Sequence, residues 1–310
     1  MKNLLTIGVI ATLLLPCAAR AQSIREAVLA AEFSFAAQAA RVGVSAAFVA
    51  NSAPAGLVAE DGKLANAQDL WRSRANRTGS RLTWYPVLAD AAQSGDLGYT
   101  TGPWTMLQND RPQTSGDYVT VWRKQPDGKW KFVVDMGVER IGTAPAKLVI
   151  VPQPHLQAAV ATPSTAPSNL VLDVDRRFAT AELLKPGATY QQYLSTEARL
   201  YRSGLSMMQG AAASANMKNI EGGYVFVATT GYLAAAGDLG YVVGTLHRPG
   251  AGTNRPSEDG SYLRIWRREA VDGWRVVLEI FNLTPNQTAA AAAPVVDGSA
   301  AHLPVVKRAQ

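Results

Sequence analysis

A nine-residue stretch of the chain occurs twice. SGDLGYTTG (94–102) returns as AGDLGYVVG (236–244), and SGDYVTVWRKQPDGKWKFVVDM (115–136) aligns with DGSYLRIWRREAVDGWRVVLEI (259–280). Equivalent residues lie 142 positions apart in the first pair of stretches and 144 apart in the second. The repeats of solenoid proteins have periods of about 20–50 residues. A period of this length therefore predicts two tandem copies of a whole domain.

The repeat divides the 310 residues into two domains and three other segments. We expect the first domain at 22–141 and the second at 170–285. Residues 142–169 contain five prolines, which disfavour a regular helix, so this segment is predicted to be a linker. The Ala-rich residues 286–310 are predicted to be a flexible tail.

The first 21 residues have the organisation of a secretory signal peptide. Lys2 precedes an apolar run from Leu4 to Leu15, and the small residues up to Ala21 fit a cleavage site. The run is too short to cross a bilayer, which needs about 20 apolar residues. The protein is therefore expected to be periplasmic or secreted, without a membrane span. Cleavage would remove Cys17, the only cysteine, so no disulfide is expected.

Charge and motifs exclude several classes of partner. The net charge is +6, but acidic and basic residues nearly balance within each domain, so we expect no nucleic-acid partner. His155, His247 and His302 lack metal-ligand spacing, so no metal site is expected. The chain has no dinucleotide fingerprint and no phosphate-binding glycine loop, so no cofactor is expected.

The first domain is predicted to begin with helices. Residues 23–53 are rich in Ala, with apolar residues at helical spacing that Gly43 interrupts. Residues 66–74 are predicted to form a second helix with Asn66 as its N-cap. A short strand is expected between these helices.

The period of the sequence then changes from 3.6 to 2. QPDGK (125–129) predicts a hairpin turn, because Pro presets φ and Gly supplies the left-handed position. Strands rich in aromatic and β-branched residues are predicted at 82–90, 96–106, 117–124 and 130–137. Helices followed by an antiparallel meander indicate an α+β fold, in which a curved sheet wraps around the N-terminal helices.

This order of elements resembles the nuclear-transport-factor-two-like superfamily, which has a cystatin-like α+β fold. The resemblance rests on the Trp84-x-Pro86 strand, SGDLGYTTGPW, and YVTVWRKQPDGKWKFVVDMG. The most similar branch is related to ketosteroid isomerase and the polyketide cyclases. It implies two tandem cone-shaped domains, each with an apolar pocket that could bind a small apolar ligand. Many relatives dimerise through their open sheet faces, so the two copies are expected to form an intramolecular pseudo-dimer in one monomeric chain.

The repeated glycines fit this implied cone. The six positions are Gly95, Gly98 and Gly102 in the first copy and Gly237, Gly240 and Gly244 in the second. Glycine within a strand pattern marks a bulge or a bend. GDLGY is therefore expected where the sheet folds over, whether or not a ligand binds there.

Two carboxylates are candidates for proton transfer. Asp135 is a polar residue in an otherwise apolar strand, and Glu279 repeats it in the second copy. If the carboxyl faces the cone interior, burial raises its pKa and suits it to shuttle a proton. By analogy with the Asp base and the tyrosine of ketosteroid isomerase, Asp135 with Tyr118 or Tyr99 forms a catalytic hypothesis.

Strand alternation makes this hypothesis specific. One face of the strand at 117–124 is expected to carry Tyr118, Thr120 and Trp122. In the next strand, alternation places Phe132, Val134 and Met136 together on the face opposite Asp135. The alternative is that Asp135 and Glu279 face solvent or pair with Arg123 and Arg264.

Aromatic residues are candidates for ligand contacts, with packing in the core as the alternative. The candidates in the first copy are Trp84, Trp104 and Trp122. Those in the second copy are Tyr241, Tyr262 and Trp266, together with Glu279. Because Leu246 stands where the first copy has Trp104, a working pocket is favoured in the first domain. Three functions stay open: a ligand-binding protein, a cofactor-free isomerase, cyclase or dehydratase, and an assembly module with both cones packed solid.

Overall fold

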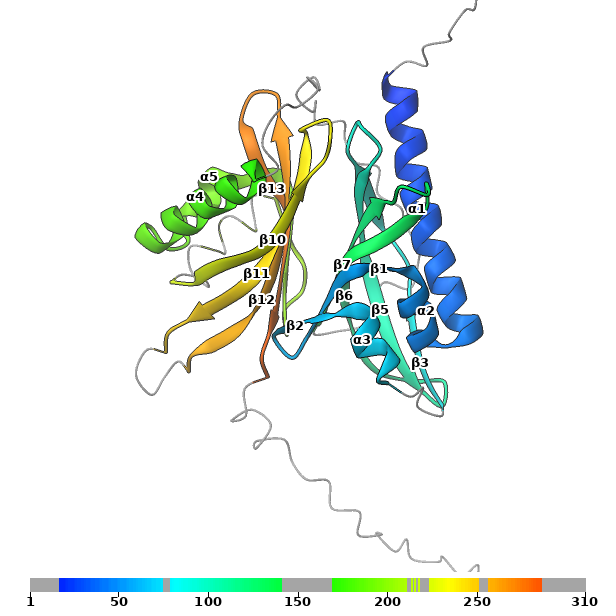
Figure 1. Cartoon of the computed structure of the whole chain (residues 1–310). Helices are drawn as coiled ribbons and strands as arrows, with labels where there is room; N and C mark the ends of the chain where they lie inside the picture. Colours follow the sequence, from blue (N-terminus) through cyan, green and yellow to red (C-terminus); the bar gives the residue numbers. More distant parts are fainter. Residues whose placement is uncertain are drawn as a thin grey trace, which may run out of the picture.

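The computed structural model describes residues 17–74, 79–140, 169–210, 213, 215, 217, 223–250 and 256–285. Two separate sheets, each with helices on one side, confirm the mixed α+β class and the two tandem domains (Figure 1). The predicted tail, nearly all of the predicted linker and residues 1–16 of the predicted signal peptide lie outside the described residues. The predicted cleavage site falls inside the first helix, which begins at Cys17.

The first domain contains three helices and a seven-stranded sheet. Its elements are α1 (Cys17–Val42), α2 (Val44–Asn51), β1 (Ser52–Glu60), β2 (Lys63–Asn66), α3 (Ala67–Arg72), β3 (Ser80–Trp84), β4 (Leu88–Ala91), β5 (Leu97–Gln108), β6 (Arg111–Lys124) and β7 (Trp130–Glu139). The strand order is β2-β1-β7-β6-β5-β3, and β4 also pairs with β5. β1 runs parallel to β7, whereas the other pairs are antiparallel.

Local chemistry explains several boundaries of the first domain. Gly43 separates α1 from α2 with φ of 93°, a conformation that favours glycine. The Asn66 side chain accepts a hydrogen bond from the backbone N–H of Asp69 at 3.1 Å, so the predicted N-cap is confirmed. Gly128 has φ of 80° in the QPDGK turn, which joins β6 to β7 as predicted.

The second domain repeats this plan. Its elements are α4 (Leu170–Leu184), α5 (Ala188–Tyr193), β8 (Leu194–Arg202), β9 (Met208–Gln209), β10 (Val225–Leu233), β11 (Leu239–Arg248), β12 (Glu258–Glu269) and β13 (Gly273–Leu283). The strand order is β10-β11-β12-β13-β8-β9, with β8 parallel to β13 as β1 is to β7. Gly187 separates α4 from α5 with φ of 71°, at the place equivalent to Gly43.

A bulge in β7 makes one sequence expectation wrong. Val121 pairs with Val134 but Trp122 pairs with Phe132, so Val133 is an extra residue without a partner in β6. The bulge reverses the side-chain faces beyond it. Phe132 therefore packs in the cone, whereas Val134 and Met136 pack on the opposite face of the sheet. The second copy has the same irregularity at Val277, between the pairs Ile265–Leu278 and Trp266–Val276.

The two sheets pack against each other, with the helices on their outer sides (Figure 1). One buried hydrophobic cluster combines residues of both domains. It includes Leu97, Tyr99, Val119, Val134 and Met136 of the first domain and Tyr201, Leu239, Tyr241, Leu263 and Ile280 of the second. Burial of such apolar area is the main force that favours association of two surfaces.

The repeated hairpin explains part of this interface. The backbone N–H of Gln93 donates to Asp238 at 3.0 Å, and the equivalent N–H of Ala235 donates to Asp96 at 3.1 Å. Each copy thus contributes the same donor and the same carboxylate. This reciprocity is the pattern of a two-fold dimer interface, here formed within one chain.

The glycines of the repeat have two roles. Gly95 and Gly237 have positive φ, 74° and 69°, in the turns before β5 and β11. At Gly98 an added Cβ would lie 2.7 Å from Val28, and at Gly240 it would lie 2.9 Å from Val171. GDLGY is therefore a hairpin turn followed by a close helix contact, which refines the bend expected from the sequence.

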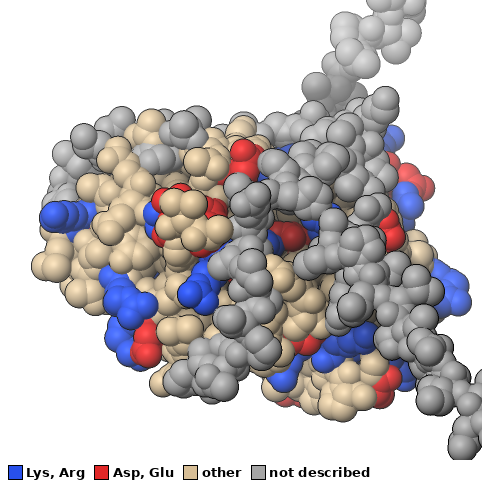
Figure 2. Space-filling model, turned by 90° about the horizontal axis from the view of Figure 1, so that it is seen from above, with Lys and Arg blue, Asp and Glu red and all other residues tan. Residues whose placement is uncertain are grey.

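Charged side chains are spread over the surface. On the face shown in Figure 2, Lys and Arg lie in several separate groups, with Asp and Glu among them. None of the helices in the described part of the chain is long and apolar enough to cross a membrane.

Candidate ligand site in the first cone

An aromatic core fills the closed end of the first cone. Phe35 of α1 lies at the centre of this core, 4.8 Å from Phe48 and 5.6 Å from Phe132 between ring centroids. Trp122 of β6 is fully buried beside them. Because α1 and α2 cover the inner face of the sheet, these rings fix the helices to it.

Above this core lies a cavity of about 210 Å³. Its wall consists of Phe48, Val58, Ala59, Glu60, Leu70, Trp71, Arg74, Leu82, Trp84, Trp104, Met106, Tyr118, Asp135 and Gly137. The wall is mainly apolar and aromatic, with few polar groups, as is typical of small-molecule sites.

Asp135 lies in this wall and is partly exposed there. Thr120 of the adjacent strand donates a hydrogen bond to its Oδ2 at 2.8 Å. Burial raises the pKa of Asp135 to about 7, although the Thr120 hydrogen bond opposes the shift. The charge of the nearby Glu32 carboxyl also contributes to this raised value. Asp135 makes no ion pair with Arg123, whose guanidinium lies 4.0 Å from the ring centroid of Tyr232.

Glu32 is a buried carboxyl that the sequence analysis did not identify. It accepts hydrogen bonds from Trp84 Nε1 at 2.6 Å, from Trp122 Nε1 at 3.0 Å, and from the Thr100 hydroxyl. Burial raises the pKa of Glu32, and these neutral donors oppose the shift. Alignment of the two copies could have revealed it, because Glu32 precedes Phe35 as Asp175 precedes Phe178.

The two candidate tyrosines lie on opposite faces of the sheet. Tyr118 is buried and lines the cavity, and its hydroxyl has no hydrogen-bond partner among the described residues. Burial, followed by the charges of Glu32 and Asp135, raises the pKa of Tyr118 well above its usual range. Tyr99 packs in the cluster between the sheets. The structure therefore brings Tyr118, and not Tyr99, to the same cavity as Asp135.

The three candidate tryptophans have different places. Trp84 and Trp104 line the cavity and pair with each other across β3 and β5. Trp122 lies in the aromatic core below and is not among the residues of the cavity wall. Trp71 of α3, which the sequence analysis did not propose, also lines the cavity, and its Nε1 has no hydrogen-bond partner among the described residues.

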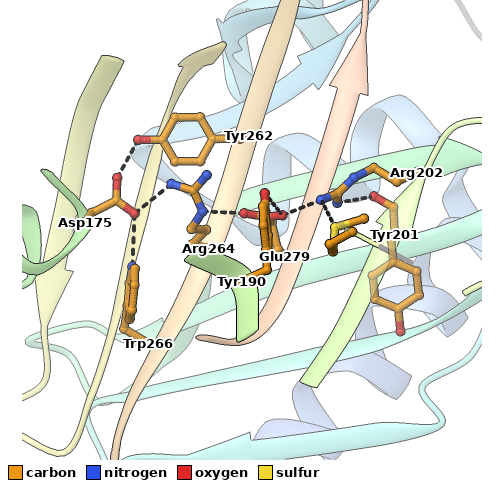
Figure 3. A network of polar contacts seen from close by, with 9 residues as sticks. Asp175, Tyr190, Tyr201, Arg202, Tyr262, Arg264, Trp266 and Glu279 are labelled. Carbon is orange, nitrogen blue, oxygen red and sulfur yellow. Dashed lines mark hydrogen bonds and ion pairs between the residues drawn. The ribbon is translucent and has the colours of Figure 1, made fainter. Parts of the chain in front are cut away.

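The second cone is occupied by its own charged side chains (Figure 3). Arg264 donates from Nη1 to Asp175 at 3.1 Å and from Nε to Glu279. Glu279 also accepts from Arg202 and from the Tyr190 hydroxyl, the latter at 3.0 Å. Burial alone would raise the pKa of Glu279, but Arg264 and Arg202 lower it below its usual value.

The candidates in the second copy therefore do not share an open site. Glu279 pairs with Arg264, as the alternative interpretation proposed. Tyr262 and Trp266 both donate to Asp175, at 2.7 and 3.1 Å, and lie in the packed core. Tyr241 packs between the sheets, so it faces away from the second cone.

Among the described residues, no group of three or more His, Cys, Asp or Glu side chains could hold a metal ion. His247 contacts Asp259 at 2.8 Å on the exposed part of the second sheet. His155 and His302 lie outside the described residues.

Comparison with known proteins gives similarities of fold. No family model and no curated protein matches the sequence. An NTF2-like protein with a cystatin-like fold from Novosphingobium aromaticivorans is 17% identical, with a TM-score of 0.36 over 44% of this chain and 95% of that one. An NTF2-like protein of unknown function from Pseudomonas putida is 19% identical, with a TM-score of 0.31 over 39% and 88%.

A third solved structure is the CaMKII hub of S. rosetta. It is 15% identical, with a TM-score of 0.32 over 39% of this chain and 98% of the hub. Each of the three covers less than half of this chain, and no activity is transferred from them. Two of the three are described as NTF2-like, the superfamily that the sequence resembles.

Proposed function

We propose that the first cone binds a small, largely apolar molecule. One observation carries this proposal: the first cone contains a cavity of about 210 Å³ lined mainly by apolar and aromatic side chains, whereas Arg264 and its partners fill the second cone. The residue of the first copy equivalent to Arg264 is Thr120, a buried residue with a short side chain that donates to Asp135 of the cavity wall. Aromatic walls then offer a large contact area to a ligand that fits.

The variant Thr120→Arg tests this proposal by supplying the first cone with the side chain that fills the second. We expect hydrophobic metabolites to raise the melting temperature of the wild-type protein and to leave that of Thr120→Arg unchanged. At a ligand concentration of 100 times Kd, binding adds about 2.7 kcal/mol to the free energy of unfolding. Equal shifts in both proteins would show that the molecules bind elsewhere.

Thr196→Arg is the matched control. Thr196 is an exposed threonine of the second domain and is not among the residues of the cavity wall, so its replacement adds the same charge away from the cavity. This control should respond to ligands as the wild-type protein does.

A second candidate function is cofactor-free proton transfer, as in an isomerase, cyclase or dehydratase. It is supported by the cavity position of Asp135, its pKa of about 7, and the unpaired hydroxyl of Tyr118 nearby. A base with a pKa near the working pH is best placed to take and return a proton. A ligand from the thermal screen can be incubated in D₂O with the protein, and NMR then measures deuterium uptake. Asp135→Asn should abolish the uptake; uptake that persists in the folded variant would refute this candidate.

The assembly-module hypothesis needed both cones to be packed solid. The second cone fits that description, but the first cone contains a cavity. The hypothesis is therefore disfavoured for the chain as a whole.

We also propose that the protein is exported. Support comes from the apolar run and the small residues of the first 21 positions. Expression in an exporting bacterium, fractionation and mass spectrometry should give a periplasmic or secreted chain that begins at Gln22. A full-length cytoplasmic chain would contradict export.

A further inference from the structure

The second cone contains a cation that the first cone lacks. Arg264 lies between the two carboxylates Asp175 and Glu279. The first cone has the corresponding carboxyls, Glu32 and Asp135. The register of the strands supports this correspondence, because Thr120 pairs with Asp135 as Arg264 pairs with Glu279.

A second cation is also missing from the first cone. In the second domain, Arg202 donates to Glu279 from the strand next to it. The equivalent residue of the first domain is Glu60, since Val58 pairs with Asp135 as Leu200 pairs with Glu279. Both arginines that neutralise Glu279 are therefore replaced, one by a hydroxyl and one by another carboxylate.

The cation that does line the cavity is already paired. Arg74 makes an ion pair with Glu60, and its guanidinium lies 4.9 Å from the ring centroid of Trp71. Among the described residues, Asp135 accepts a side-chain hydrogen bond from Thr120 alone, at its Oδ2. The second carboxylate oxygen of Asp135 is thus left for a partner from outside the chain.

Aromatic rings complete the resemblance between the two sites. The guanidinium carbon of Arg264 lies 4.2 Å from the ring centroid of Phe178, 3.9 Å from that of Phe226 and 4.5 Å from that of Tyr262. The residues at these positions in the first copy are Phe35, Trp84 and Tyr118. Trp84 and Tyr118 line the cavity, together with Trp71 and Trp104. The faces of such rings attract an organic cation, because the ring quadrupole is negative on its face.

From this correspondence we propose that the ligand of the first cone is a small organic cation, a guanidinium or primary ammonium group on an apolar body, whose charge pairs with Asp135. The proposal rests on the proposed function, namely that the cavity binds a small molecule. The cationic group contacts Asp135, the counterpart of the Glu279 that pairs with Arg264, and the apolar body contacts Trp104 and Met106 in the cavity wall. A neutral molecule that accepts a hydrogen bond from protonated Asp135 is the competing possibility.

Three probes that share a benzyl group separate these possibilities: benzylguanidine, benzylamine and benzyl alcohol. Isothermal titration calorimetry at pH 8 should show the two cations binding at least tenfold more tightly than the alcohol. Asp135→Asn should weaken the cations at least tenfold and change the affinity for the alcohol by less than about twofold. The variant is nearly isosteric, and its melting curve and near-UV circular dichroism verify its fold.

The pH dependence provides a second readout. Affinity for the cations should fall as pH decreases from 8 to 5, because protonation of Asp135 removes the negative charge that binds them. The other charged or titratable groups near Asp135 are Glu32 from α1, Glu60 from β1, Arg74 after α3 and Tyr118 from β6. Protonation of Glu32 acts in the same direction, so the inference requires that the Asp135→Asn variant flatten most of the profile.

The outcomes distinguish this inference from the proposed function. If benzyl alcohol binds as tightly as benzylamine, or if Asp135→Asn weakens all three probes alike, the cation inference is wrong while the cavity remains a ligand site. If no probe and no screened metabolite binds the wild-type protein, both proposals fail. Thr120→Arg should abolish cation binding, because the introduced arginine would itself pair with Asp135.

Discussion

The two cones have the same framework but opposite interiors. Both contain a carboxyl on the first helix, a carboxyl on the last antiparallel strand, and a buried tryptophan between them that donates to the helix carboxyl. In the second cone the space between the carboxyls holds Arg264, and the pKa of Glu279 is lowered. The first cone has Thr120 at that position, Asp135 lies in the wall of a cavity, and the pKa of Asp135 is raised. The replacement of Arg264 by Thr120 and of Arg202 by Glu60 therefore accompanies the change from a packed core to a candidate binding site.

The largest expected effect is the removal of the central cation of the second cone. Arg264→Thr should lower the free energy of unfolding by about 4 kcal/mol, because it leaves Asp175 and Glu279 buried without their shared partner. Urea unfolding monitored by fluorescence measures this change. Thr120→Arg, the reverse exchange in the first cone, should be much milder, because the new guanidinium can pair with Asp135, which has no cationic partner among the described residues. A loss below about 1 kcal/mol for Arg264→Thr would show that the network does not stabilise the second cone.

The ion pair between the domains should have the next largest effect. Asp90 and Arg267 form a buried ion pair across the interface. Asp90→Asn should cost about 3 kcal/mol, because Arg267 keeps its charge in a dry environment. Differential scanning calorimetry should then show two transitions in place of one as the halves lose their coupling. A single transition at the wild-type temperature would contradict this role.

The ionised carboxylate of Asp135 should lower the free energy of unfolding at high pH. The pKa of Asp135 is about 7 in the folded state, above its usual value of 3.8, so the folded state binds the proton more tightly than the unfolded state does. Stability should therefore fall as pH rises from about 4 to 7, and Asp135→Asn should abolish that cost. Because the cavity keeps this carboxyl partly hydrated, we expect the variant to gain about 2 kcal/mol at pH 8.

The matching comparison is between pH 4 and pH 8. At pH 4 the stabilities of the Asp135→Asn variant and the wild-type protein should be nearly equal. Urea unfolding at both values measures the difference. A gain of equal size at both pH values would show that the effect does not come from the ionisation of Asp135.

The smallest effect should come from the interface contact that is the pseudo-symmetric counterpart of the Asp90 ion pair. Arg123 lies over the ring of Tyr232 where Arg267 meets Asp90, and Tyr232 also donates to Asp96 at 2.9 Å. Tyr232→Leu should cost about 1 kcal/mol, because this contact is less buried and one partner is neutral. If Tyr232→Leu lowered the free energy of unfolding more than Asp90→Asn does, the burial of charge would not decide which of the two contacts is stronger.

Much of the fold could be predicted from the sequence because the chain repeats it. The glycines of GDLGY, the QPDGK turn and the Asn66 cap each specify a local conformation by themselves. The bulge at Val133 could not be predicted, because it depends on pairing with β6 and leaves no mark in a run of apolar residues. It placed Phe132, which was expected on the same face as Val134 and Met136, on the face of Asp135.

The candidate site was predictable in part. Asp135 and Tyr118 stand on expected strand faces and do reach the cavity. Tyr99 does not, because side chains alternate along β5 and Tyr99 lies on the face opposite Trp104, between the sheets. Glu32 was missed because a single Glu in an Ala-rich helix has the pattern of an exposed residue, and burial by Trp84 and Trp122 depends on the tertiary structure.

Strand β7 belongs to the cavity and to the interface at once. Asp135 faces the cavity, while its neighbours Val134 and Met136 press against the second sheet. β7 therefore cannot move away from the cavity to make room for a larger ligand unless the two sheets separate. Any expansion must come from the opposite side, where the short helix α3 places Leu70 and Trp71 over the cavity. The second domain thus holds β7 in position, and the position of α3 limits the size of the ligand.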